Sequence, residues 1–402
     1  MRKSCVYLYM IISSLILTGC WDRYELEERA NILGLAIDLA DEDEIEKEPE
    51  VTHRLNHFPG GKTGQFYKIT AQVAVPGKIK LGPEGGGGEG SEKTAWIIKT
   101  FGHTMNDAMA NLQQQLAEKL YLGHLQIIVV SREVSEKGVS EINDFLRRDP
   151  EVRRTAWMII DDKDASKVLK AAPPIETVPS LYLSDTLDNA VRFGKLPREY
   201  MGKFWIDLSD DGVDATLPAV KVMGNDRLLI DGMAFFKGDK MVGKTTPGEI
   251  GAYMGMKEKS PGGYSIIVSI EDEEGVYLIK SLKRKSKTAV EIRDGKPMAF
   301  INIKVEAAIE EKTNDSKLDS DTLKKVELAA NKKAEEICSE LVKKLQEKGS
   351  DIFGLGARVK AKYAGYWERE VNRDEQWSNV FKEMEIKVKA DFNIRRAGME
   401  IN

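Results

Sequence analysis

One segment of the chain matches, letter for letter, a motif that binds phosphate. Residues 238–245 read Gly-Asp-Lys-Met-Val-Gly-Lys-Thr and fit the pattern G-x-x-x-x-G-K-[ST]. Such a loop holds phosphate only when a buried strand precedes it and a helix begins at its lysine. Here residues 246–248 (Thr-Pro-Gly) are a poor helix start, and apolar runs at 228–236 and 241–244 favour a β-hairpin. We therefore expect no nucleotide to bind, and the glycine-rich run 82–90 also lacks the strand-to-helix spacing.

The histidines are the residues best suited to bind a metal ion. There are four, His53, His57, His103 and His124, and only the first two are close in sequence. Two ligands do not make a zinc site, and residues 41–64 are expected to form a loop with no helix to align them. We therefore expect no metal site, with His53 and His57 on the surface of a loop.

The sequence singles out no residues for covalent or acid–base catalysis. It contains no G-x-S-x-G motif and no cysteine with a paired histidine, and among 65 acidic residues no carboxylate pair stands out. Cys338 lies at helical spacing with Ala334 and Leu341, which is typical of a small core residue rather than a reactive thiol. We expect no catalytic residue, no cofactor and no internal disulfide.

The first twenty residues have the layout of an export signal. Arg2 and Lys3 give a basic start, residues 6–17 form an apolar run too short to span a bilayer, and Gly19 precedes Cys20. The ending Leu-Thr-Gly-Cys resembles the lipobox of bacterial lipoproteins. That resemblance implies cleavage between Gly19 and Cys20 and attachment of acyl chains, such as palmitate, at Cys20. Two acyl chains make a stable anchor. An ordinary secretory signal is the alternative.

Length and charge limit the class of protein. The chain has 402 residues, of which 31% are charged and 42% apolar, and its formal net charge is −5. Removing the signal with Arg2 and Lys3 leaves 58 basic and 65 acidic residues, a net charge of about −7. This balance argues against a nucleic-acid partner. The remaining length is enough for two or three domains with their own cores.

Residues 20–196 are expected to form a first, α/β domain after the signal peptide of residues 1–19. In chain order, we expect strands at 32–39, 67–75, 95–101, 124–131 and 155–161, and helices at 104–120, 139–146, 165–170 and 181–193. The alternation of strands and helices indicates an α/β domain. Almost no tether separates Cys20 from the first strand, so this domain should lie against the membrane.

Two further domains are expected, a small strand-rich one at 203–262 and an α+β one at 263–402. Their expected strands are 215–222, 228–236, 241–242, 264–270, 276–287, 288–292, 298–310 and 384–394. A long helix at 321–348 should end at Gly349, followed by a helical stretch at 351–363 and an aromatic-rich loop containing Tyr366, Trp367 and Trp377. The fold class is therefore mixed α/β and α+β, with three consecutive domains built on mixed or antiparallel sheets.

A basic run, Lys280–Lys287, allows two interpretations. Its five cationic side chains could meet anionic lipid head groups, each contributing about 1 kcal/mol. Lysines also protect the edge strands of sheets from pairing with other chains. We favour edge protection.

Several blocks together resemble one family, the Ger(x)C lipoproteins, which are C subunits of nutrient germinant receptors in endospore-forming bacteria. The resemblance covers nearly the full chain. The blocks are Gly19-Cys20-Trp21-Asp22 with Glu25, Gly102-His103-Thr104, Leu120 to Gln126, Arg153-Arg154, Gly232 to Gly243 and Phe353 to Gly356. The block from Gly102 to Gln126 is the most specific of them.

The resemblance implies a three-domain, non-enzymatic protein on the outer face of the spore inner membrane. It would be anchored in membrane lipid through Cys20 and assembled with integral A and B receptor subunits. The family brings no catalytic residues, and helix or strand capping explains His103 and His124 as well as ligand binding does. A solute-binding lipoprotein of a transporter is the alternative, and a surface hydrolase is a third class.

Overall fold

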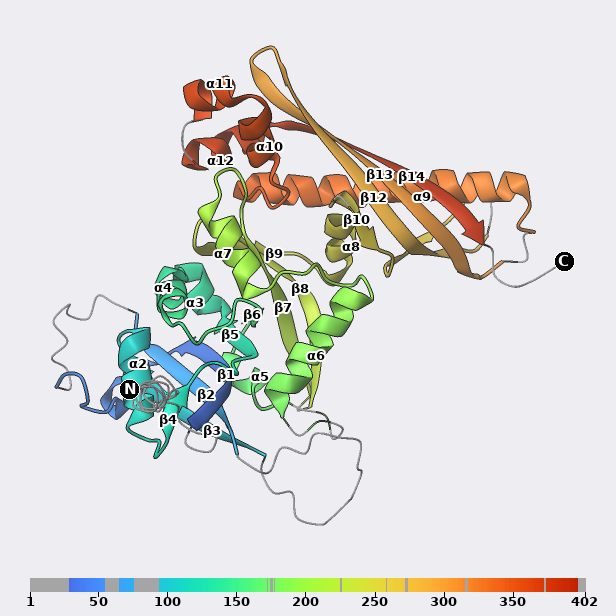
Figure 1. Ribbon diagram of the computed structural model, residues 1–402. Helices are drawn as coiled ribbons and strands as arrows, with labels where there is room; N and C mark the ends of the chain where they lie inside the picture. Colours follow the sequence, from blue (N-terminus) through green and yellow to red (C-terminus); the bar gives the residue numbers. More distant parts are fainter. Residues whose placement is uncertain are drawn as a thin grey trace, which may run out of the picture.

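The computed structural model describes residues 29–54, 65–75 and 94–396, except 172, 174–175, 177, 225, 258, 272–273, 315–316 and 372–373. Two sheets organise these residues, one of nine strands and one of five. In Figure 1 the second sheet projects from one end of the first, together with the long helix α9 (Ser320–Lys348). Helices pack on both sheets, which confirms the mixed α/β fold class.

The nine-stranded sheet has a parallel centre and antiparallel flanks. Its order is β3 (Ala95–Gly102), β2 (Tyr67–Ala74), β1 (Arg29–Leu39), β5 (Ile127–Ser131), β6 (Trp157–Asp161), β7 (Thr216–Met223), β8 (Arg227–Lys237) and β9 (Lys240–Lys244), with β4 (Lys119–Tyr121) beside the start of β1. Strands β1, β5, β6 and β7 run parallel to one another. Every expected strand of residues 29–161 that lies in the described ranges is confirmed, with small shifts of its ends.

Helices cover both faces of this sheet because both faces are apolar. On β5, Ile128 and Val130 join one buried cluster while Ile127 and Val129 join another, as the two-residue period of a strand requires. The first cluster includes side chains of α2 (Met105–Gln113), α3 (Arg132–Lys137), α4 (Ser140–Arg148) and α7 (Met201–Ser209). The second includes α5 (Ala165–Val168), α6 (Pro179–Arg192) and α8 (Pro247–Met256). A short 3-10 helix, η2 (Glu42–Lys47), follows β1.

The five-stranded sheet is built on one long hairpin. Strands β12 (Tyr277–Arg293) and β13 (Lys296–Lys312) have 17 residues each, and Asp294 and Gly295 turn between them with φ of 49° and 76°. The sheet is completed by β10 (Lys259–Pro261), β11 (Ser265–Val268) and β14 (Glu385–Arg396). Helix α9 packs on one face and ends at Gly349, which has the left-handed conformation expected of a helix-ending glycine.

The two sheets share one continuous core. Residues of β5 and α6 belong to the same buried cluster as those of β13 and α9. Strands β7, β8 and β9 extend the first sheet by pairing onto β6, so hydrogen bonding crosses the expected boundary near Lys195. The helix α7 also occupies the beginning of the region that was expected to be rich in strands.

Four local expectations were wrong. The helix at 104–120 ends at Gln113, because Leu116 and Leu120 belong to a turn and to β4. The expected strands 276–287 and 288–292 are one strand, β12. The aromatic-rich loop is helical, with α11 (Ala364–Tyr366), a π-helix at Trp367–Val371 and α12 (Asp374–Glu383) after α10 (Leu355–Lys362). Helix α3 was not expected at all.

Candidate functional site

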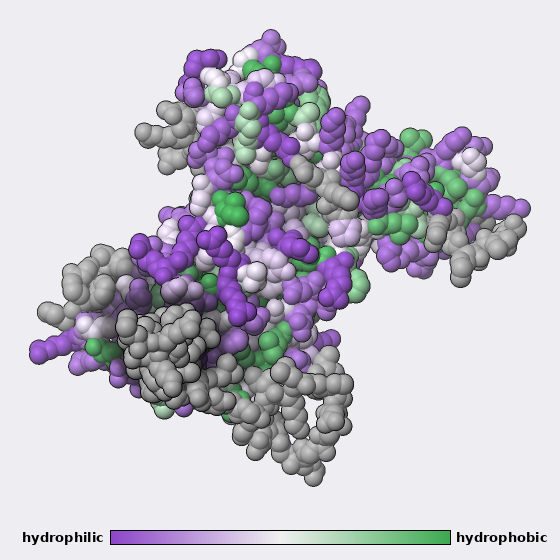
Figure 2. All heavy atoms as spheres, viewed as in Figure 1, coloured by the Kyte–Doolittle hydropathy of each residue, from purple (hydrophilic) through white to green (hydrophobic). Residues whose placement is uncertain are grey.

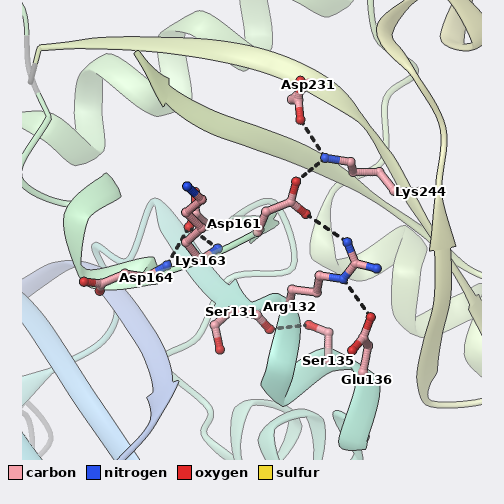
Figure 3. A network of polar contacts seen from close by, with 10 residues as sticks. Ser131, Arg132, Ser135, Glu136, Asp161, Lys163, Asp164, Asp231 and Lys244 are labelled. Carbon is pink, nitrogen blue, oxygen red and sulfur yellow. Dashed lines mark hydrogen bonds and ion pairs between the residues drawn. The ribbon is translucent and has the colours of Figure 1, made fainter. Parts of the chain in front are cut away.

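Polar side chains gather at the carboxyl ends of the parallel strands β5 and β6, the edge at which open α/β sheets bind ligands. Figure 3 shows this network. Lys244 lies between Asp162 and Asp231, with Nζ 2.6 Å from Oδ2 of Asp231. Arg132 donates to Glu136 over 2.7 Å and approaches Asp162 at 3.9 Å. Lys244 and Arg132 thus each have carboxylate partners from this chain.

The phosphate-loop match is part of this network and does not form a phosphate loop. Strands β8 and β9 pair as an antiparallel hairpin across it, as expected. Burial lowers the pKa of Lys244, but its hydrogen bonds to Asp162 and Asp231 outweigh burial and leave that pKa raised. The expectation that residues 246–248 cannot start a helix was wrong. Thr246 caps α8, with Pro247 in the first turn and Glu249 completing a capping box.

Asp38, near the end of β1, is a second carboxylate at the same edge. Its two oxygens accept backbone N–H bonds from Ala165 and Ser166 at 2.8 and 3.2 Å, which places the carboxylate at the first turn of α5. Burial raises the pKa of Asp38 to about 6, although these two bonds lower it. Asp38 therefore acts as a structural cap whose charge depends on pH.

Two histidines and a glutamate meet at the same end of the strands as Asp38, beside the end of β3. Nε2 of His53 lies 3.4 Å and Nε2 of His103 lies 3.3 Å from Oε2 of Glu48. The two imidazole rings stand edge to face with centroids 5.2 Å apart. Phe66 packs against His103 at 4.9 Å between ring centroids and shields one side of the cluster. The structure thus brings together two of the sequence-predicted histidines and one residue that the sequence did not single out.

Backbone elements fix these side chains from two directions. Glu48 follows η2 directly, and His103 sits between the end of β3 and Thr104, the N-cap of α2. Asp107 connects the two segments, since it accepts the backbone N–H of His103 at 2.9 Å and the hydroxyl of Thr52. His103 and its neighbours are close to α2 because Gly102 has no side chain. A Cβ at Gly102 would lie 2.4 Å from the backbone nitrogen of Ala108.

The electrostatics of the cluster are unusual for a surface loop. The Glu48 residue is 6% exposed, and neither carboxylate oxygen has a hydrogen-bond partner among the described residues. Burial, together with the nearby charge of Asp107, raises the pKa of Glu48 to about 8. Burial and the neighbouring His53 lower the pKa of His103. His53 lies in a loop as expected, but its side chain is only 11% exposed, so the expectation that it lies on the surface of that loop was wrong.

The other sequence-predicted residues do not join this cluster. His124 stacks edge to face on Tyr121, with ring centroids 5.7 Å apart. Cys338 is 3% exposed in the core, and burial raises the pKa of its thiol to about 12, which confirms the core interpretation. Gly19, Cys20 and His57 lie outside the described residues, as does the glycine-rich run.

The basic run does not lie on a sheet edge. Strand β12 pairs with β13 on one side and with β10 and β11 on the other, so Lys283 and Lys285 belong to an inner strand. Arg284 is 3% exposed and donates to four backbone carbonyls, those of Gly194, Gly251, Pro261 and Gly262. The edge-protection interpretation was therefore wrong, because the run belongs to an inner strand and its Arg284 is buried at the joint between the two sheets.

Glu48 was the functional candidate that sequence reasoning missed. It lies in an acidic segment, residues 41–50, where carboxylates are common and none stands out. The only available signal was its position between the first strand and His53. This position identifies Glu48 as a functional candidate only once β3 and α2 are known to place His103 next to it.

Comparison with known proteins covers almost the whole chain. Residues 22–222 match the family described as "Spore germination protein N-terminal domain", and residues 231–398 match "Spore germination B3/ GerAC like, C-terminal". The two matches meet between β7 and β8. The nine-stranded sheet therefore takes its last two strands from the C-terminal family unit.

Curated relatives align over similar lengths. The chain is 25% identical to "Spore germination protein KC" of Bacillus subtilis, with 100% of this chain and 97% of that protein covered. It is 27% identical to "Spore germination protein GerQC" of Bacillus cereus over 83% of this chain and 90% of that protein. It is also 22% identical to "Spore germination protein B3" of Bacillus subtilis over 99% of both.

A solved structure shares the fold. The "Crystal Structure of the GerBC protein" superposes with a TM-score of 0.54 and 18% sequence identity, over 82% of this chain and 94% of that chain. This likeness concerns the fold alone. The family follows from two other findings. The family models match both halves of the chain, and a curated relative aligns with its full length. The chain belongs to the Ger(x)C family of spore germination proteins.

Proposed function

We propose that this chain is the lipid-anchored C subunit of a nutrient germinant receptor, required for spores to germinate in response to nutrients. The observation that carries the proposal is the alignment of the entire chain with spore germination protein KC, supported by matches to both family units. The role is non-enzymatic. The subunit acts by assembling with integral A and B subunits on the outer face of the spore inner membrane.

The signal sequence supports the anchoring part of the proposal. It ends in Leu17-Thr18-Gly19-Cys20, and acylation of Cys20 would supply a stable attachment to lipid. Within the part of the chain that the structure describes, no helix is long and apolar enough to cross a membrane. The visible face in Figure 2 is largely hydrophilic, with apolar residues in small separate groups. The resemblance of residues 17–20 to a lipobox is the reason why we assign membrane attachment to Cys20.

The experiment is the variant Cys20→Ala, compared with Cys5→Ala. Both replace a cysteine in the first twenty residues, but only the first removes the acylated thiol. We expect Cys20→Ala spores to lose the protein from the membrane fraction and to germinate poorly with nutrients, whereas Cys5→Ala spores behave as wild type. Fractionation of spore membranes and loss of optical density after nutrient addition measure the two effects. Full retention and full germination of Cys20→Ala would refute the anchor.

A solute-binding lipoprotein is the second candidate, and one observation favours it. A cavity of about 580 Å³ lies between α8, α9 and the second sheet, lined by apolar side chains including Ile266, Ile337 and Phe392. Such proteins have two similar lobes around a cleft, whereas the two sheets here differ in strand number and order. Calorimetric titration of the full chain with amino acids and sugars distinguishes the candidates, because only a solute-binding protein should bind one of them by itself.

A further inference from the structure

Glu48, His53 and His103 converge on one point between η2 and the β3–α2 junction. One ligand atom from each lies within 4.8 Å of the other two. The set of two imidazoles and one carboxylate is common in sites that bind zinc with three protein ligands. We propose that these three side chains bind one divalent transition-metal ion of the zinc type. The proposal is independent of the receptor-subunit role.

The separations fit metal ligands better than hydrogen bonds. Zinc bonds to imidazole nitrogen and carboxylate oxygen are about 2.0–2.2 Å long, so two ligand atoms at the tetrahedral angle lie about 3.4 Å apart. The two Nε2–Oε2 separations are 3.4 Å for His53 and 3.3 Å for His103. A good N–H···O hydrogen bond would be about 2.9 Å. The two nitrogen–oxygen separations thus already match the spacing that a tetrahedral metal ion imposes.

A chain of hydrogen bonds orients His53 for metal binding. The Thr52 hydroxyl donates its single proton to Asp107 and lies 2.9 Å from Nδ1 of His53. With that proton committed to Asp107, the Thr52 oxygen can accept the Nδ1–H of His53, and this tautomer leaves a lone pair on Nε2. Nε2 of His53 lies 3.4 Å from Oε2 of Glu48. Metal-binding histidines are commonly held in this way by a hydrogen bond through the second ring nitrogen.

Burial of Glu48 gives an independent reason for a cation. A carboxylate that is out of contact with water and accepts no hydrogen bond is costly in the folded state. Both oxygens of Glu48 are in that situation among the described residues. A metal ion bound by both Nε2 atoms would give at least one of these oxygens a partner. It would also tie residues 48–53 to α2, which binds the segment after β1 to the helix layer.

The test measures zinc binding to the full-length protein, purified in detergent and stripped of metal with a chelator. After equilibrium dialysis against Zn²⁺ alone, bound zinc is counted by mass spectrometry. We expect one ion per wild-type chain and at least about a hundredfold weaker binding for Glu48→Gln and His53→Ala. Thr52→Val should weaken binding about ten- to a hundredfold by releasing the orientation of His53. The variant His124→Ala removes a histidine outside the cluster and should bind as wild type.

Thermal unfolding separates a lost site from a lost fold. The neutral amide of Glu48→Gln is cheaper to bury, so this variant without zinc should melt no lower than metal-free wild type. Zinc should raise the melting temperature of wild type by several degrees and leave that of Glu48→Gln unchanged. If wild type binds no zinc at a defined stoichiometry, or Glu48→Gln binds it as tightly, the proposal fails and the three side chains form a metal-free polar cluster only.

Discussion

The two sheets place their buried polar groups in different ways. In the nine-stranded sheet, titratable groups collect where strands meet helices, as with Asp38 at α5 and with Glu48 and His103 near α2. In the five-stranded sheet, the buried polar groups of β12 bond to backbone carbonyls. Arg284 donates to four of them, and Ser286 donates to Met256 at 2.8 Å.

The difference separates residues whose protonation can change near neutral pH from residues whose charge and hydrogen bonds stay fixed. Groups such as Asp38 and Glu48 have pKa values raised by burial to about 6 and about 8, so proton or cation binding can alter them. Burial lowers the pKa of Arg284 to about 10, so its charge stays fixed near neutral pH. The first sheet therefore holds Asp38 and Glu48, whose protonation can change near neutral pH, whereas the joint with the second sheet holds Arg284, whose charge does not.

The largest expected effect is that of Arg284→Lys at the joint. The ammonium group keeps the charge but cannot reach four carbonyls as the planar guanidinium does. Buried carbonyls left without a donor should lower the free energy of unfolding by about 3–4 kcal/mol. Urea unfolding of the full chain measures the loss, with Lys285→Arg at the exposed neighbouring position as the control. A loss of unfolding free energy below about 0.5 kcal/mol would show that the joint does not depend on the hydrogen bonds of the Arg284 guanidinium group.

A smaller, pH-dependent effect is expected from Asp38→Asn. The folded-state pKa of Asp38, about 6, lies above its ordinary value of 3.8, so the folded state binds the proton more tightly. The stability that this gives is fully present below about pH 3.8 and is lost as pH rises through about 6. The difference in unfolding free energy between wild type and variant should therefore change by about 2–3 kcal/mol across this window.

Chemical denaturation at closely spaced pH values measures this difference. Asp210→Asn removes a carboxylate at an exposed position and should follow the wild-type profile. If the stability of wild type and of Asp38→Asn depends on pH in the same way, Asp38 does not change its protonation in this window. The contrast between titratable groups in the first sheet and fixed charges at the joint would then lose one of its two examples.

The smallest effect is expected at the cap of α8, the helix that connects the two regions. Thr246→Ala removes the hydroxyl that accepts the N–H of Glu249 at 3.3 Å. Loss of an N-cap should cost about 1 kcal/mol in thermal or urea unfolding, and Thr246→Ser should restore it. Equal stability of the alanine and serine variants would mean that packing alone positions α8.

The sequence predicted most of the fold because its strands and long helix carry strong local patterns. The range 321–348 differs by one residue from α9, and the turn at Asp294-Gly295 is where the residue types place it. The errors came from residue patterns that are compatible with two different local conformations. Leu116 and Leu120 keep the helical spacing of α2, but they pack from a turn and from β4. A proline at the first helical position was interpreted as a break at 246–248 although it favours a helix start.

The candidate site could not be predicted in the same way. His53 and His103 are fifty positions apart, and no periodicity connects them. Their meeting depends on the pairing of β2 with β3 and on the close approach of α2 at Gly102, which are long-range contacts. Glu48 looked like one more solvated acid until the packing around it was known.

The hairpin β8–β9 has a consequence for the order in which the molecule can form. Strand β7 ends at Met223, and among the described residues its outer edge pairs with β8 alone. While the chain is being synthesised, that edge stays open until residues 227–244 have emerged, and an open edge invites pairing with another chain. A fragment cut at residue 222, where the first family unit ends, would keep this edge exposed permanently. Soluble expression of the N-terminal unit should therefore require extension through Lys244.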